Sequence, residues 1–183
     1  FDHIAWGDMA ALDAAITDNT AGVIVETVQG EGGIRPLTAE MLSHIRQVCD
    51  ARGLLLILDE VQCGVGRSGT LFAYETFGIE PDILASAKGL GGGFPIGACL
   101  VSEKVGQHMV LGTHGSTFGG NPLAAAVGNA VLDLVFEPGL LENVQKQAET
   151  LRAGLEELVS ECPAVLSKVS GLGLMIGARC EIP

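Results

Sequence analysis

Residues 54–62 read LLLILDEVQ, a run of five apolar residues followed by two carboxylates. The run has the length of a strand but lacks the alternation of apolar and polar residues that marks a strand with one face in water. A strand buried on both faces is typical of a parallel sheet covered by helices. We therefore predict an α/β fold in which residues 54–58 form an inner strand and Asp59 lies at its carboxyl end.

The flanking sequence alternates between helical and extended patterns. We expect helices over residues 8–17 and 38–52, and strands over residues 22–28, 82–86 and 96–102. Thr38 is placed to cap the second helix, and Gly53 to end it. Alternating helices and strands of this kind are typical of a mostly parallel sheet.

The pattern changes after residue 120. Asn121 and Pro122 predict the start of a helix that runs to about residue 136, and a long amphipathic helix follows before Pro163. Residues 171–180 predict the first strand of a separate small sheet. We therefore predict that residues 1–137 belong to a large domain and that residues 138–183 begin a small α+β domain.

Composition restricts the partners and the location. The 183 residues carry a formal charge of −12, and the ten Lys and Arg residues form no run, which argues against a nucleic-acid or anionic-membrane surface. The five cysteines form no CxxC pair, so we expect no metal, no disulfide framework and a cytoplasmic location. The chain starts without methionine and stops just after a predicted strand, so we expect an internal part of a longer protein.

Three predicted strands end in residues that can carry chemistry. Glu26, Asp59 and the segment 86–88 occupy the carboxyl ends of strands, where α/β sheets bind ligands. A lysine and a carboxylate in such a place are, by themselves, more often a structural ion pair than a cofactor site. Lys88, however, is followed by the glycines of GLGGG, which leave room for a ligand. A lysine with a nearby acid is what pyridoxal phosphate needs.

Four motifs in this order resemble a known family. VETVQGEGGIRP, LLLILDEVQCGVGRSGTLFAYE, DILASAKGLGGGFPIGACL and THGSTFGGNPLAAAVGNAVL are similar to segments of the class III, subgroup II, pyridoxal-phosphate-dependent aminotransferases. The resemblance runs from one end of the chain to the other. It implies the type I fold of pyridoxal phosphate enzymes, a homodimer that shares its active site, and small-molecule substrates.

The resemblance also assigns cofactor contacts. Lys88 would form the Schiff base with pyridoxal phosphate and then carry the proton between the substrate and the cofactor. Asp59 would pair with the pyridinium nitrogen, Val61 would pack on the ring and Gln62 would bind the ring hydroxyl. Residues 59–62, with Glu60 among them, would thus form one cofactor-binding turn.

Other contacts implied by the resemblance involve substrate and a second subunit. Thr117 would bind the cofactor phosphate of the neighbouring subunit, and Ser116 would lie near the substrate. Glu31 resembles the glutamate that pairs with an arginine while the ω-amino donor is bound and releases it for 2-oxoglutarate. That arginine, the phosphate-binding turn and the ring-stacking aromatic residue are not found in this chain. Thr27 stands where the family usually has proline, and Cys63 where threonine is common.

Within the family the motifs look most like members that move the ω-amino group of N2-acetyl-L-ornithine to 2-oxoglutarate in arginine biosynthesis. Succinylornithine, ornithine, succinyldiaminopimelate and 4-aminobutyrate are alternative donors. A non-catalytic dimerisation or binding fragment is a further alternative. Residues 64–69, GVGRSG, match the dinucleotide pattern GxGxxG, but DEVQC separates them from the strand and residue 89 is not acidic.

Overall fold

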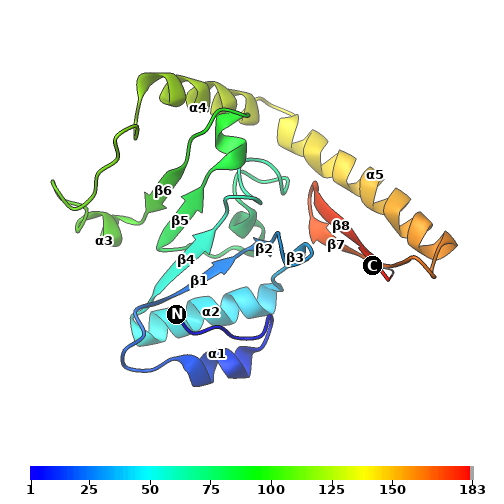
Figure 1. Cartoon of the computed structure of the whole chain (residues 1–183), viewed down its shortest axis with the longest axis horizontal. Helices are drawn as coiled ribbons and strands as arrows, with labels where there is room; N and C mark the ends of the chain where they lie inside the picture. Colours follow the sequence, from blue (N-terminus) through cyan, green and yellow to red (C-terminus); the bar gives the residue numbers. More distant parts are fainter. Residues whose placement is uncertain (182–183) are drawn as a thin grey trace.

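The computed structural model describes residues 1–181 and is built around one four-stranded sheet. The strands lie in the order β1 (Gly22–Glu26), β4 (Leu55–Asp59), β5 (Ile83–Ser86) and β6 (Ala98–Val101). The first three are parallel, and β6 runs antiparallel to β5 (Figure 1). The mostly parallel α/β sheet expected from residues 54–58 is therefore confirmed.

Two helices lie below the sheet in Figure 1, α1 (Met9–Ala15) and α2 (Ala39–Arg52). As expected, the Thr38 hydroxyl accepts a hydrogen bond from the Met41 amide, and Gly53 ends α2 with φ 68°. The buried cluster between these helices and the sheet includes Leu12, Leu42, Ile45, Cys49, Leu56 and Leu58. Apolar side chains from α2 thus cover one face of β4.

The other face of β4 differs from the expectation. Leu56 and Leu58 are buried, but Leu55 and Ile57, which point the opposite way, are only half-buried. The apolar run predicted burial on both faces of the strand. Within residues 1–181, the side chains are fully buried on only one face. The strand position was correct, and the full burial was not.

The remaining elements are short or lie towards the end of the chain. They are β2 (Val28–Gln29), β3 (Arg35–Pro36), the 3-10 helices η1 (Ala73–Phe77) and η2 (Lys88–Gly91), and the helices α3 (Glu103–Gly106), α4 (Pro122–Val135) and α5 (Leu140–Glu161). Asn121 caps α4 as expected, with its side-chain oxygen accepting from the Ala124 amide. Within residues 1–181, no single helix is long and apolar enough to span a membrane. Helices α4 and α5 are long and apolar enough only when they are counted together, and a bend of 71° separates them.

The end of the chain forms a hairpin where we expected one strand. Strands β7 (Leu166–Leu172) and β8 (Met175–Cys180) pair antiparallel, and Gly173, at φ 56°, lies in the turn between them. Residues 166–172 contain lysine, serine and glycine and lack a clear apolar alternation, which is why the first strand was missed. The proposed domain boundary at residue 137 falls between α4 and α5, and the division remains a prediction.

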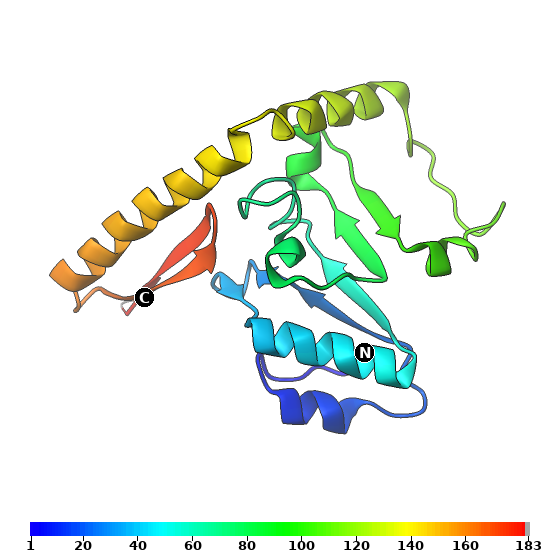
Figure 2. The same ribbon diagram turned by 180° about the vertical axis from the view of Figure 1, so that it is seen from behind.

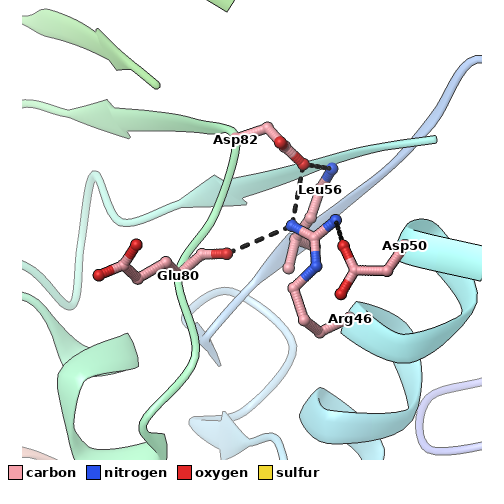
Figure 3. Close-up of polar contacts among 5 residues, drawn as sticks. All are labelled: Arg46, Asp50, Leu56, Glu80 and Asp82. Carbon is pink, nitrogen blue, oxygen red and sulfur yellow. Dashed lines mark hydrogen bonds and ion pairs between the residues drawn. The ribbon is translucent and has the colours of Figure 1, made fainter. Parts of the chain in front are cut away.

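A polar cluster ties α2 to the amino-terminal side of β4 and β5 (Figure 3). Arg46 Nη1 donates to Asp82 Oδ2 at 2.9 Å and to the Glu80 carbonyl at 3.2 Å, while Arg46 Nη2 lies 2.8 Å from Asp50 Oδ1. Asp82 Oδ2 also accepts the Leu56 amide at 2.8 Å. Burial alone would raise the pKa of Asp82, but the Leu56 amide and the Arg46 guanidinium outweigh it and lower the pKa.

Replacing Asp82 tests this cluster. Asp82→Ala leaves the Leu56 amide without its acceptor and removes the less exposed of the two carboxylates that pair with Arg46, and we expect the free energy of unfolding to fall by about 2 kcal/mol. Urea unfolding at pH 7 measures the loss. The matched control is Asp50→Ala, because the Asp50 side chain is 66% exposed and its exposed ion pair should contribute less than about 0.5 kcal/mol.

The pH dependence provides a second readout of the same variant. Ionised Asp82 contributes stability above its ordinary pKa of 3.8, and this contribution disappears as pH falls through the lower pKa of the folded state. The difference between wild type and Asp82→Ala should therefore shrink in strong acid. Equal losses for the Asp82 and Asp50 variants at pH 7 would contradict the role of the cluster.

Candidate active site

The carboxyl ends of three neighbouring strands meet at one edge of the sheet. Glu26 ends β1 opposite Asp59, which ends β4, and Asp59 in turn lies opposite Ala85 of β5. Lys88 follows three residues after Ala85, at the start of η2. The structure thus brings Asp59 and Lys88 to adjacent strand ends, as the sequence predicted.

Asp59 and Lys88 do not form an ion pair, which was the structural alternative to a cofactor site. Within residues 1–181 the ion pairs are His44–Asp13, Arg46–Asp50, Arg46–Asp82 and Arg179–Glu181. Lys88 is exposed, and Asp59 is half-buried with its Oδ1 accepting from the Val61 amide at 3.0 Å. The turn after β4 therefore fixes the aspartate, while the lysine amine has no carboxylate neighbour among the described residues.

Two cavities flank these strand ends. One, of about 720 Å³, is lined by Glu26, Gln29 and Asp59 and extends along β1 to the start of the chain. The other, of about 580 Å³, is lined by Gln62 and Lys88 together with residues of α5 and β8. Asp59 and Lys88 thus lie at or just beyond the ends of neighbouring strands but line different cavities in this structure.

The smaller cavity is bordered by unusual backbone. Among residues 1–181, only Ile34, Val65 and Lys88 have positive φ without being glycine, with values of 53°, 54° and 39°. All three line this cavity. Left-handed conformations are rare for β-branched residues such as isoleucine and valine, and strained backbone of this kind clusters at functional sites. Sequence patterns gave no indication of this strain, because none of the three positions carries a glycine.

Glu60 requires a correction. We expected it among the cofactor contacts, but its side chain is fully buried. Its carboxylate accepts from the Ala73 amide at 2.6 Å, from the Tyr74 amide at 2.8 Å and from the Thr27 hydroxyl at 2.9 Å. Burial raises the pKa of Glu60, and the three donors oppose the rise. The side chain joins the site loops, and it lines neither of the two cavities.

This network also explains the departure from the family pattern at residue 27. Thr27 is fully buried, and its hydroxyl is one of the three donors to Glu60. From the sequence, Thr27 could be identified only as a departure from the proline that is usual in the family. Its partner could not be inferred, because Glu60 is 33 residues away along the chain.

Glu31 and Gln62 are in contact, and the roles assigned to them remain predictions. Gln62 Nε2 donates to Glu31 Oε1 at 3.1 Å, and the turn that carries Glu31 is held by Glu26 Oε2, which accepts the Gly30 amide at 2.9 Å. A side chain at Gly30 would collide with the Gln62 amide, so glycine provides the space for this contact. The side chains of Glu31, in VETVQGEGGIRP, and Gln62, in LLLILDEVQ, therefore join two segments that are distant in the sequence.

Ser116 and Thr117 lie elsewhere. They belong to an exposed segment between α3 and α4 that extends beyond β6 in Figure 1, and Ser116 Oγ accepts the Gly119 amide at 2.9 Å. The structure does not bring either residue to Lys88. Their assigned contacts, which involve a neighbouring subunit for Thr117, remain predictions.

The sequence alternatives can be compared with the same geometry. Residues 64–69 form turns, and the short helix η1 begins only at Ala73, so the strand-to-helix context of a dinucleotide fingerprint is missing here. Residues 1–181 contain no cluster of His, Cys, Asp and Glu that could hold a metal ion. Burial raises the pKa of the Cys63 thiol to about 12, which excludes a thiolate nucleophile at neutral pH.

Thr27→Val tests the buried network. Valine keeps the shape of threonine but removes the hydroxyl, and we expect the free energy of unfolding to fall by about 1.5 kcal/mol at pH 7. The loss should shrink in acid, because the raised pKa of Glu60 means that its carboxylate is protonated there. Chemical denaturation across pH measures both effects. Thr27→Ser keeps the hydroxyl but loses a buried methyl group, so its loss should not depend on the protonation of Glu60. Thr76→Val at an exposed site should be close to wild type. A Thr27→Val variant as stable as wild type would contradict the network.

Known proteins share both the sequence and the fold. The model of the aminotransferase class-III family matches residues 3–183. The acetylornithine aminotransferase of Mesorhizobium japonicum is 54% identical over 183 residues, which are 100% of this chain and 46% of that protein. The chain thus spans about half the length of the curated relatives it matches.

Two solved structures extend the comparison. The N-acetylornithine aminotransferase of Stenotrophomonas maltophilia matches with a TM-score of 0.88 and 40% identity, covering 100% of this chain and 47% of that one. The ornithine aminotransferase of Toxoplasma gondii, described with partial occupancy of PLP at its active site, matches with a TM-score of 0.92 and 35% identity, over 99% of this chain and 43% of that one. With the family model matching nearly its whole length, this chain belongs to the class-III aminotransferase family.

Proposed function

We propose that this protein is a pyridoxal-phosphate-dependent aminotransferase that moves the ω-amino group of N2-acetyl-L-ornithine to 2-oxoglutarate. The observation that carries the proposal is the placement of Lys88 and Asp59 at adjacent strand ends in a chain 54% identical to an acetylornithine aminotransferase. A non-catalytic fragment would have no need of an unpaired lysine beside an oriented carboxylate.

The residues at the strand ends fit the cofactor. The amine of Lys88 is exposed and has no carboxylate neighbour within residues 1–181, so it is free to condense with an aldehyde. The Val61 amide occupies only one oxygen of Asp59, which leaves the other for a ring nitrogen. When bound, pyridoxal phosphate supplies an aldehyde that condenses with amines and a ring that accepts electrons from the substrate carbon.

The chain's own residues then have distinct tasks. Lys88 would hold the cofactor through its amine and would move a proton at the reacting substrate carbon. Asp59, oriented by the Val61 amide, keeps the ring nitrogen protonated because a carboxylate favours a nearby positive charge. The Val61 side chain would pack on the ring, and the Gln62 amide would bind the ring hydroxyl.

Substrate and subunit contacts complete the proposal. Glu31, next to Gln62 in this structure, pairs with an arginine while the ω-amino donor is bound. Ser116 lies near the substrate, and Thr117 binds the cofactor phosphate of a second copy, so the active unit is a homodimer. We also propose a cytoplasmic location, which is consistent with five free cysteines, and a large domain that ends at residue 137.

Ornithine is the second candidate donor. The Toxoplasma gondii ornithine aminotransferase has a TM-score of 0.92 against this chain, compared with 0.88 for the Stenotrophomonas maltophilia acetylornithine enzyme. Sequence identity favours the acetylated donor, at 40% against 35% for these two structures. Backbone similarity does not distinguish donors, because donor choice depends on side chains at the site.

Substituting the two central residues tests the cofactor chemistry. In the complete protein, Lys88→Ala should abolish the visible absorption band of lysine-bound pyridoxal phosphate and lower kcat by about 10³-fold or more. Asp59→Ala should keep the band but lower kcat by about 10²-fold, because the ring becomes a weaker electron acceptor. Lys104→Ala, at an exposed lysine of α3, is the matched control. A band that survives Lys88→Ala, or full turnover by Asp59→Ala, would overturn the assignment.

Donor preference is tested separately. We expect kcat/KM for N2-acetyl-L-ornithine to exceed that for ornithine by about tenfold or more, a difference of about 1.4 kcal/mol. Acetylation converts a charged α-ammonium group into a neutral amide, and a site suited to the amide has no partner for the charge. Succinylornithine, succinyldiaminopimelate and 4-aminobutyrate are compared in the same assay with 2-oxoglutarate. A clear preference for 4-aminobutyrate would rule out the proposed donor.

A further inference from the structure

The C-terminal hairpin contacts the turn that carries Glu31. Strand β7 lies beside the short strand β3, which follows that turn, and Figures 1 and 2 show the hairpin next to β2 and β3 from both sides. Ser170 of β7 donates its hydroxyl hydrogen to the Ile34 carbonyl at 2.7 Å. A residue 136 positions later in the chain therefore holds the last peptide of the turn.

The side chain of Ile34 is held by the same hairpin. A Cβ atom added at Gly177 of β8 would come within 3.0 Å of Ile34 Cγ1 and 3.3 Å of Ile34 Cβ. Glycine at this position therefore leaves the space that Ile34 occupies. Ile34 also packs against a buried cluster that includes Met175 of β8. Both the carbonyl and the side chain of Ile34 thus rest on β7 and β8.

These contacts act on a strained residue. Ile34 has φ 53°, a left-handed conformation that is costly for a β-branched side chain and persists only where its surroundings impose it. In this conformation the Ile34 amide donates to the Gly30 carbonyl at 3.2 Å, as does the Gly33 amide. The hydrogen bonds close the turn around Glu31. Releasing Ile34 would allow the turn to relax.

The conformation of this turn determines where Glu31 contacts Gln62. Glu31 Oε1 accepts from Gln62 Nε2, and the Gln62 side chain fills the space beside Gly30 at the start of the turn. We propose that the β7–β8 hairpin, through Ser170 and the space at Gly177, positions the Glu31–Gln62 pair, and that Ser170 is a positioning residue for the exchange between amino donor and 2-oxoglutarate. This inference rests on the role of Glu31 in the proposed function.

Hydrogen exchange tests the mechanical part in the complete, cofactor-free protein. Ser170→Ala should speed exchange of the Gly33 and Ile34 amides by about fivefold, the effect of losing one hydrogen bond. Ser170→Thr keeps the hydroxyl and should keep the protection. Ser167→Ala, at an exposed serine of the same strand, is the matched control. The β4 amides should be unchanged in every variant. Unchanged exchange at Gly33 and Ile34 would overturn the inference, whatever the enzyme activity.

The two half-reactions test the functional part. Measured separately in single turnovers, Ser170→Ala should slow the amino-donor half-reaction about threefold more than the 2-oxoglutarate half-reaction, in the same direction as Glu31→Gln. The double variant should be no worse than Glu31→Gln alone. Gly177→Ala, which pushes on Ile34, should shift the ratio in the same direction. Equal slowing of both half-reactions, or additive effects in the double variant, would overturn positioning. Absence of any transamination in the wild-type protein would instead reject the proposed function.

Discussion

The site loops depend on one buried charge. Glu60 lies between Asp59, which faces the site, and Val61, whose amide orients Asp59. A fully buried carboxylate is unfavourable unless donors surround it, and here the donors come from Thr27 after β1 and from the amino end of η1. The requirement to satisfy Glu60 therefore brings together three segments that are distant in the sequence. The turn after β4 can take its shape only when these segments are in place.

Parallel strand pairing provides the other half of the arrangement. The register that sets Glu26 against Asp59 and Asp59 against Ala85 carries three chain segments out of the sheet at the same edge. Lys88 reaches this edge three residues after the paired part of β5. The register thus places the lysine and the aspartate as neighbours without any direct contact between them. In the proposed function the cofactor is the molecule that both residues contact.

Local sequence patterns predicted those features that depend on local chemistry. The position of the strand at residues 54–58, the cap at Thr38 and the N-cap at Asn121 were correct, because each depends on a few adjacent residues. Lys88 and Asp59 could be placed because strand ends are predictable from apolar runs. Glu60 was misassigned, because its donors lie 13 to 33 residues away and periodicity does not reveal them. The same holds for the contact between Ser170 and Ile34, which joins opposite ends of the chain.

The two edges of the sheet carry different kinds of residue. The Arg46 cluster lies at the amino-terminal side of β4 and β5, while Lys88 lies at their carboxyl ends. Genetic lesions at the two edges should differ in kind. Loss of Asp82 from the Arg46 cluster would lower the amount of folded protein, so a cell would lose the proposed activity only when warmed. With the role proposed for Lys88, a substitution there would leave the protein abundant but inactive at every temperature. The growth temperature at which an allele fails would therefore indicate which edge of the sheet it affects.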